Sequence, residues 1–109
     1  MSDITTHVLD TVLGKPASGI YVCLERRVNE NWVTLGHGVT DSDGRCRDLA
    51  PRAEKGTYRL TFKTGDYLIG QGRSTLYPEV TVVYECDGDA HYHLPLLLSD
   101  NCFTTYRGS

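Results

Sequence analysis

Residues 91–98 read His-Tyr-His-Leu-Pro-Leu-Leu-Leu, and this stretch decides the fold because its two sets of alternate residues differ in character. Alternate residues of an extended strand share one face. One set is apolar and would face a core: Tyr92, Leu94, Leu96 and Leu98. The other set carries both histidines: His91, His93, Pro95 and Leu97. The stretch therefore predicts a β-strand whose histidines point away from the core.

The same two-residue period runs through the rest of the chain. The apolar partners of this alternation are expected to point inward: Ile20, Val22, Leu24, Tyr58, Leu60, Phe62, Val80, Val82 and Tyr84. Turn-forming residues separate the runs. Together these signals predict strands at 6–11, 19–27, 31–38, 44–49, 57–64, 78–86, 91–98 and 102–107. Short strands at such regular spacing are typical of an all-β sandwich or barrel.

One short helix is expected at 65–70. Thr64 is expected to cap its start through the side-chain hydroxyl. Gly70 and Gly72 are expected to end it, because glycine accepts the left-handed backbone that helix ends often need.

Length and charge narrow the class of protein. A chain of 109 residues suits one domain, residues 1–109. The formal net charge is −3, so no basic stripe is expected that could neutralise nucleic-acid phosphates. No apolar stretch approaches the roughly 20 residues of a membrane helix. Residues 1–6 carry no basic, apolar targeting pattern, so a cytoplasmic protein is expected. The periplasm or a peroxisome is the alternative compartment if a targeting segment lies outside this sequence.

The four cysteines are interpreted as free thiols: Cys23, Cys46, Cys86 and Cys102. No two of them are close in sequence, and a disulfide is rare in the cytoplasm. The absence of a CxxC pair also argues against a structural zinc site.

His7 and His93 are the candidate chemical groups of the predicted strands. Each lies on a mixed face of its strand, and such a face often meets a partner or a ligand. Histidine titrates near neutral pH, so two histidines at one site could move protons in a hydrolysis. The His-x-His pair could instead hold a metal with His7 as third ligand, but metal-free catalysis is favoured.

Six motifs resemble one known family. They are 7–11 (HVLDT), 14–17 (GKPA), 40–46 (TDSDGRC), 77–80 (YPEV), 93–99 (HLPLLLS) and 106–109 (YRGS). Over essentially the whole chain they closely resemble the 5-hydroxyisourate hydrolases, which are transthyretin-related enzymes. The terminal YRGS is the most specific motif, and transthyretin itself lacks it.

The resemblance implies a transthyretin-like two-sheet β-sandwich and a set of site residues. The catalytic residues of the family fall on His7, Arg45, His93 and Ser109. Substrate-binding residues fall on His7, Arg45, Tyr106, Arg107 and Gly108. Tyr106 can also be interpreted as part of the wall, and Gly108 as a residue that permits the backbone path. His91 is interpreted as a neighbour near the strand entrance, because it falls outside the family positions. His37 is interpreted as structural or solvent-facing, because no motif includes it.

The resemblance also implies the activity and the assembly. The family hydrolyses 5-hydroxyisourate to 2-oxo-4-hydroxy-4-carboxy-5-ureidoimidazoline in urate catabolism, with no organic cofactor. Its members are homotetramers, dimers of dimers, with the active sites in a channel at the dimer–dimer interface. The alternatives are a transthyretin-like carrier of small hydrophobic ligands in the same channel, or an inactive scaffold that docks partners.

Overall fold

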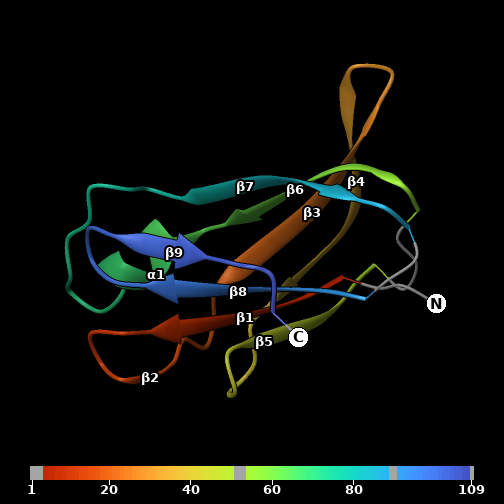
Figure 1. Cartoon of the computed structure of the whole chain (residues 1–109). Helices are drawn as coiled ribbons and strands as arrows, with labels where there is room; N and C mark the ends of the chain where they lie inside the picture. The colour runs from red at the N-terminus through yellow and green to blue at the C-terminus, as the bar shows by residue number, and fades with distance from the viewer. Residues whose placement is uncertain (1–3, 51–53, 89–90, 109) are drawn as a thin grey trace.

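Two β-sheets face each other, and a computed structural model describes them over residues 4–50, 54–88 and 91–108, except for the side chains at positions 48 and 50. The first, sheet A, contains β1 (Ile4–Asp10), β2 (Lys15–Pro16), β5 (Arg45–Ala50), β8 (Tyr92–Leu98) and β9 (Phe103–Thr105). The second, sheet B, contains β3 (Tyr21–Val28), β4 (Asn31–Val39), β6 (Gly56–Phe62) and β7 (Val80–Cys86). The helix α1 (Thr64–Ile69) connects β6 to β7 (Figure 1). The predicted two-sheet sandwich with one short helix is confirmed.

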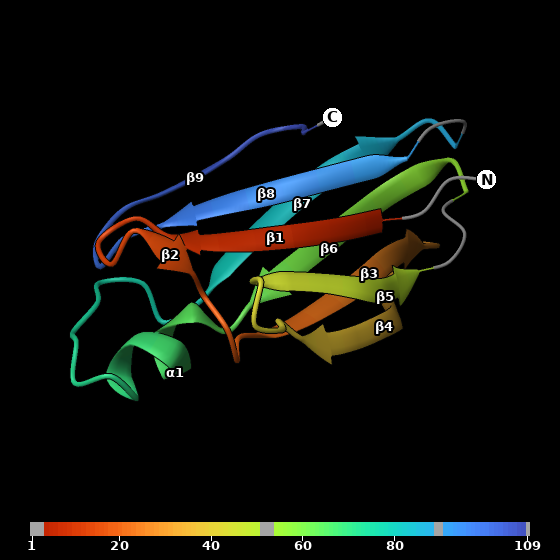
Figure 2. The ribbon, with the colours of Figure 1, turned by 90° about the horizontal axis from the view of Figure 1, so that it is seen from below.

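The order of strands in sheet A brings the two ends of the chain together. That order is β2-β1-β8-β9. β5 also pairs with β1, along its first half from Ile4 to His7. β1 and β8 run parallel, so that Thr5 pairs with His93 and His7 pairs with Pro95. β5 runs antiparallel to β1 and pairs Arg45 with His7. β5, β1 and β8 therefore form three neighbouring rows of one surface, which overlies sheet B in Figure 2.

The core lies between the sheets and follows the predicted alternation. In β8 the apolar set is buried and His93 is half-buried. In β1, Val8 is buried while His7 on the other face is half-buried. Sheet B contributes the two largest of the fully buried side chains, Tyr58 and Phe62, together with Leu24 and Leu60. His7 and His93 therefore lie on the outer face of sheet A, as the alternation of residues in their strands predicts.

Two glycines of β4 allow β5 to pack closely against it. A methyl group at Gly36 would collide with the backbone carbonyl of Leu49. A methyl group at Gly38 would lie 2.8 Å from the Sγ of Cys46. This close approach holds β5 at the flank of the sandwich, where its arginines can point outward.

Several boundaries differ from the prediction. β2 was not expected, and the last strand covers 103–105 instead of 102–107. Thr64 is the first helical residue and its buried hydroxyl has no hydrogen-bond partner in the described structure, so the predicted cap is wrong. Gly72 has the expected left-handed backbone (φ +72°), but Gly70 is right-handed (φ −60°). The helix is too short for its ends to be read from the sequence.

A buried carboxylate ties the end of β1 to the segment after α1. Asp10 is fully buried and accepts hydrogen bonds from Arg73 Nη1 (2.6 Å) and from the Tyr67 hydroxyl (2.8 Å). Burial alone would raise the pKa of Asp10, but hydrogen bonds from Arg73, the Leu13 amide and Tyr67 outweigh it and lower the pKa to about 2. Arg73 also pairs with Asp100 at 2.6 Å. The network therefore connects the end of β1 to the segment after α1, which carries Arg73, and to the β8–β9 loop, which carries Asp100.

The structure joins none of the four cysteines in a disulfide. In the part of the chain that the structure describes, no helix combines the length and the apolar character that a membrane crossing needs.

Candidate active site

His7 and His93 meet on the outer face of sheet A. They come from neighbouring parallel strands, and their ring centroids are 6.3 Å apart with the planes inclined by 35°. Both side chains are half-buried. A small molecule or a water on this face could therefore contact both imidazoles at once.

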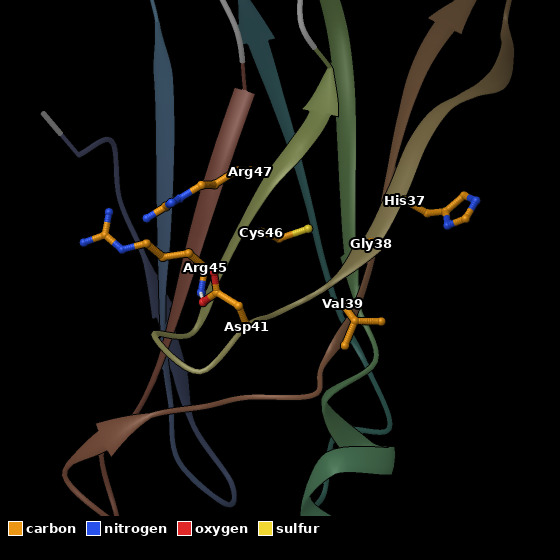
Figure 3. Close-up of a pocket in the computed structure, with 7 residues that line it drawn as sticks. All are labelled: His37, Gly38, Val39, Asp41, Arg45, Cys46 and Arg47. Carbon is orange, nitrogen blue, oxygen red and sulfur yellow. Dashed lines mark hydrogen bonds between the residues drawn. The ribbon is translucent and has the colours of Figure 1, made fainter.

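Arg45 flanks this pair from β5, directly across from His7. In Figure 3 the side chains of Arg45 and Arg47 extend to the same side of β5, while Cys46 points to the opposite side. Both arginines also line a pocket on this flank with Asp41 and His37. The outer face of sheet A therefore has two guanidinium groups on the β5 side, each able to bind a planar, oxygen-rich or anionic group.

The C-terminal segment runs back along β8 on the side opposite to β1 (Figure 2). The Gly108 amide donates to the His93 carbonyl at 2.7 Å, in an isolated antiparallel bridge. A methyl group at Gly108 would lie 2.9 Å from His93 Cδ2 and 3.2 Å from Pro95 Cγ. The segment thus comes close to His93 because residue 108 has no side chain.

Tyr106 and Arg107 precede Gly108 in the described part of the C-terminal segment. The Arg107 guanidinium lies 4.3 Å from the centre of the Tyr92 ring, in a cation–π contact. Tyr106 is 54% exposed. Ser109, expected to be catalytic, lies outside the described residues.

Thr5 joins the two histidines of the His-x-His pair. Its Oγ1 is 2.8 Å from His93 Nδ1 and 3.2 Å from His91 Nε2. The rings of His91 and His93 stack with centroids 6.4 Å apart and an angle of 12°. His91, interpreted from sequence as a neighbour, thus contacts the same hydroxyl as His93.

The surroundings of His93 favour its neutral form. Burial lowers its pKa, and the nearby His7, Arg45 and His91 lower it further because each disfavours a second positive charge. The lowered pKa favours the neutral ring, the form in which an imidazole can accept a proton.

The fourth histidine is separate from this group. His37 is exposed on β4, and its ring lies 5.8 Å from that of Tyr21. In Figure 3 it points away from the arginines. Within residues 4–50, 54–88 and 91–108, no group of three or more His, Cys, Asp or Glu side chains is arranged to hold a metal ion.

A family model covers almost the whole chain. The model of the HIUase/transthyretin family matches residues 4–108. The chain belongs to the HIUase/transthyretin family. This membership confirms the resemblance that the sequence motifs indicate.

Relatives in this family span bacteria and animals. The chain is 43% identical over 109 residues to a 5-hydroxyisourate hydrolase of Salmonella dublin, covering 97% of this chain and 80% of the relative. It is 42% identical over 113 residues to that of Mus musculus, covering 99% and 96%. It is similar to a solved 5-hydroxyisourate hydrolase of Klebsiella pneumoniae, with a TM-score of 0.89, 35% identity and full coverage of both chains. Transthyretin from Sparus aurata gives a TM-score of 0.93 at 28% identity, covering 99% and 97%.

The structure brings most of the expected site residues of this HIUase/transthyretin-family chain to one face. His7, Arg45 and His93 occupy adjacent strands, and Gly108 bridges to His93. Sequence reasoning missed Thr5 and Arg47. A signal for both existed, because Thr5 shares the parity of His7 and Arg47 that of Arg45.

Proposed function

We propose that this protein hydrolyses 5-hydroxyisourate to 2-oxo-4-hydroxy-4-carboxy-5-ureidoimidazoline in urate catabolism. The observation that carries the proposal is the convergence of His7, His93 and Arg45 on the outer face of sheet A. Relatives named 5-hydroxyisourate hydrolase, more than 40% identical over nearly the whole chain, support the same reaction. The transthyretin fold alone does not favour a carrier, because the fold is common to both classes.

In the proposed reaction, His93 acts as the base. His93 and His7 orient a water molecule, and His93 takes a proton from it as the water oxygen bonds to the ring carbonyl carbon. The carbonyl oxygen becomes an oxyanion, which Arg45 balances with fixed positive charge. In this scheme Arg107 adds to that charge when it leaves its contact with Tyr92, on the opposite face of β8 from His93. When the C–N bond of the ring breaks, the imidazolium returns its proton to the leaving nitrogen. The enzyme forms no covalent intermediate and needs no organic cofactor.

The remaining expected residues bind the substrate in this scheme. Tyr106 and Gly108 line the site beside His93, and Ser109 positions substrate or water through its hydroxyl or carboxylate. Support for this arrangement comes from the hydrogen bond between the Gly108 amide and the His93 carbonyl.

The proposed active form is a homotetramer, a dimer of dimers, with the outer faces of sheet A lining a channel. Exposed apolar side chains support association, since Val12 and Leu13 in the turn after β1 and Tyr106 after β9 are each more than 40% exposed. The chain acts as one domain over residues 1–109, and we propose the cytoplasm as its compartment.

The decay of 5-hydroxyisourate tests the function. Urate is oxidised enzymatically, and the ultraviolet absorbance of the fresh product is followed with and without protein. Acceleration in proportion to protein concentration is expected. A rate equal to the spontaneous one, together with tight binding of thyroxine, would instead identify a carrier.

A further inference from the structure

Thr5 lies at the centre of a hydrogen-bonded chain that the reaction scheme above does not use. Its position on β1 is directly opposite His93 on β8. The single oxygen Oγ1 is within hydrogen-bond distance of a ring nitrogen of each histidine, at 2.8 Å from His93 Nδ1 and at 3.2 Å from His91 Nε2. Both distances join side chains that are more than 80 residues apart in sequence, so the register of β1 against β8 creates the contact.

We propose that Thr5, with His91 as its second partner, is a positioning residue that fixes the tautomer of His93. The inference rests on the proposed hydrolase function, since it concerns the base of that reaction. A threonine hydroxyl has one proton to donate and two lone pairs to accept. In the proposed arrangement it donates to one of the two rings and accepts from the other.

The direction of this chain decides whether His93 can act as a base. When the Thr5 hydroxyl donates to His91 Nε2, it accepts from His93 Nδ1–H. A neutral imidazole carries only one N–H, so Nε2 of His93 is then an unprotonated acceptor on the far side of the ring. In the reverse direction Nε2 carries the proton and cannot take one from water. The proposed direction, in which His91 accepts the Thr5 proton, therefore leaves His93 Nε2 available as a base.

The same arrangement holds after proton transfer. When His93 Nε2 takes a proton from water, Nδ1–H remains a donor to Thr5, so the imidazolium keeps its hydrogen bond. His91 thus acts through Thr5 and need not contact the substrate. This role gives His91 a function that its position just outside the family motifs does not indicate.

Thr5→Val tests the proposal with little change of shape. Valine has nearly the same volume as threonine and suits a strand, but it cannot hydrogen-bond. We expect kcat/KM to fall by on the order of tenfold or more, a part of the 10²–10⁴ that positioned acid–base catalysis contributes. Thr5→Ser keeps the hydroxyl and should retain most of the activity.

Thr6→Val is the matched control. The Thr6 hydroxyl also connects β1 to β8, donating to the Leu94 carbonyl at 2.6 Å, but from the buried face. This variant loses a hydroxyl between the same two strands and leaves the outer face intact. It should lower the temperature of unfolding while kcat/KM stays within twofold of wild type. An equal loss of activity in Thr5→Val and Thr6→Val would overturn the proposal, because a general weakening of the β1–β8 pairing would then explain both.

The tautomer itself is measured by ¹⁵N NMR of the histidine rings in the folded protein. In wild type and Thr5→Ser we expect the His93 signals of the Nδ1–H form, and in Thr5→Val a shift toward the Nε2–H form. Unchanged His93 signals in Thr5→Val would refute the positioning role even if activity fell. This measurement needs no turnover, so a wild-type protein that fails to accelerate 5-hydroxyisourate decay would refute the proposed function while the tautomer result still judges Thr5.

Discussion

Replacing Gly108 with alanine should damage the active site far more than the fold. The added methyl group would lie 2.9 Å from His93 Cδ2 and 3.2 Å from Pro95 Cγ. Carbon atoms in good contact are about 3.5–4.0 Å apart, so the C-terminal segment or the His93 ring must move by roughly 0.5–1 Å. The clash therefore falls on the proposed base itself.

A displacement of this size has a large effect on catalysis, since a 1 Å error in position can reduce the rate by about 10²-fold. We expect kcat/KM for 5-hydroxyisourate to fall by roughly 10- to 100-fold. The loss of unfolding free energy should stay near 1 kcal/mol, because one backbone hydrogen bond, from Gly108 N to His93 O, is at risk.

The assay compares 5-hydroxyisourate decay and thermal unfolding of the variant with those of Gly70→Ala. Gly70 ends α1 with an ordinary right-handed backbone, and a methyl group there meets only carbonyl oxygens of the helix, at 3.1 Å or more. Gly70→Ala should therefore keep wild-type turnover. Wild-type turnover in Gly108→Ala would refute the reasoning, since the close approach of the C-terminal segment would then be irrelevant to the reaction.

Three further outcomes follow from the buried ion pair and from the proposed chemistry. Arg73→Met leaves the fully buried Asp10 without its guanidinium partner and should reduce the free energy of unfolding by about 3–5 kcal/mol. The measurement is urea unfolding at pH 7 and at fixed protein concentration. A loss below about 1 kcal/mol would contradict this expectation. The pKa of Asp10 is about 2 in the fold and 3.8 in its ordinary state, so its ionised form contributes about 2 kcal/mol, present above pH 4 and lost as the pH falls toward 2. The stability of Asp10→Asn should change less over that pH range, and parallel curves would argue against the assignment. Dialysis against a chelator should leave 5-hydroxyisourate turnover unchanged; a loss that zinc restores would show that the histidines act through a metal.

The sequence predicts the faces of the strands better than the contacts between them. Alternation in β3, β6 and β8 identifies the buried sets because a half-buried strand repeats every two residues. The six-residue helix α1 and the two-residue strand β2 have too few residues to show a sequence period. Because the start of so short a helix is hard to place, Thr64 was predicted to cap α1, whereas it is the first helical residue.

The candidate site shows the same division. His7, Arg45 and His93 could be proposed from the family motifs, but nothing local says that Thr5 meets both His91 and His93. That contact depends on the parallel register of β1 and β8, and most of the chain lies between these two strands in the sequence. The Asp10–Arg73 pair was missed although Asp10 shares the buried parity of Val8, and a carboxylate in that position requires a charged or hydrogen-bonding partner.

Three of the four histidines allow the central claim to be tested in one series. The rate of 5-hydroxyisourate decay is measured for wild type, His7→Ala, His93→Ala and His37→Ala at equal protein concentration. His7 and His93 share the outer face of sheet A, whereas His37 is exposed on β4 and points away from it. The account predicts rates close to spontaneous decay for His7→Ala and His93→Ala and the wild-type rate for His37→Ala. Full turnover by His93→Ala in a folded protein would contradict it.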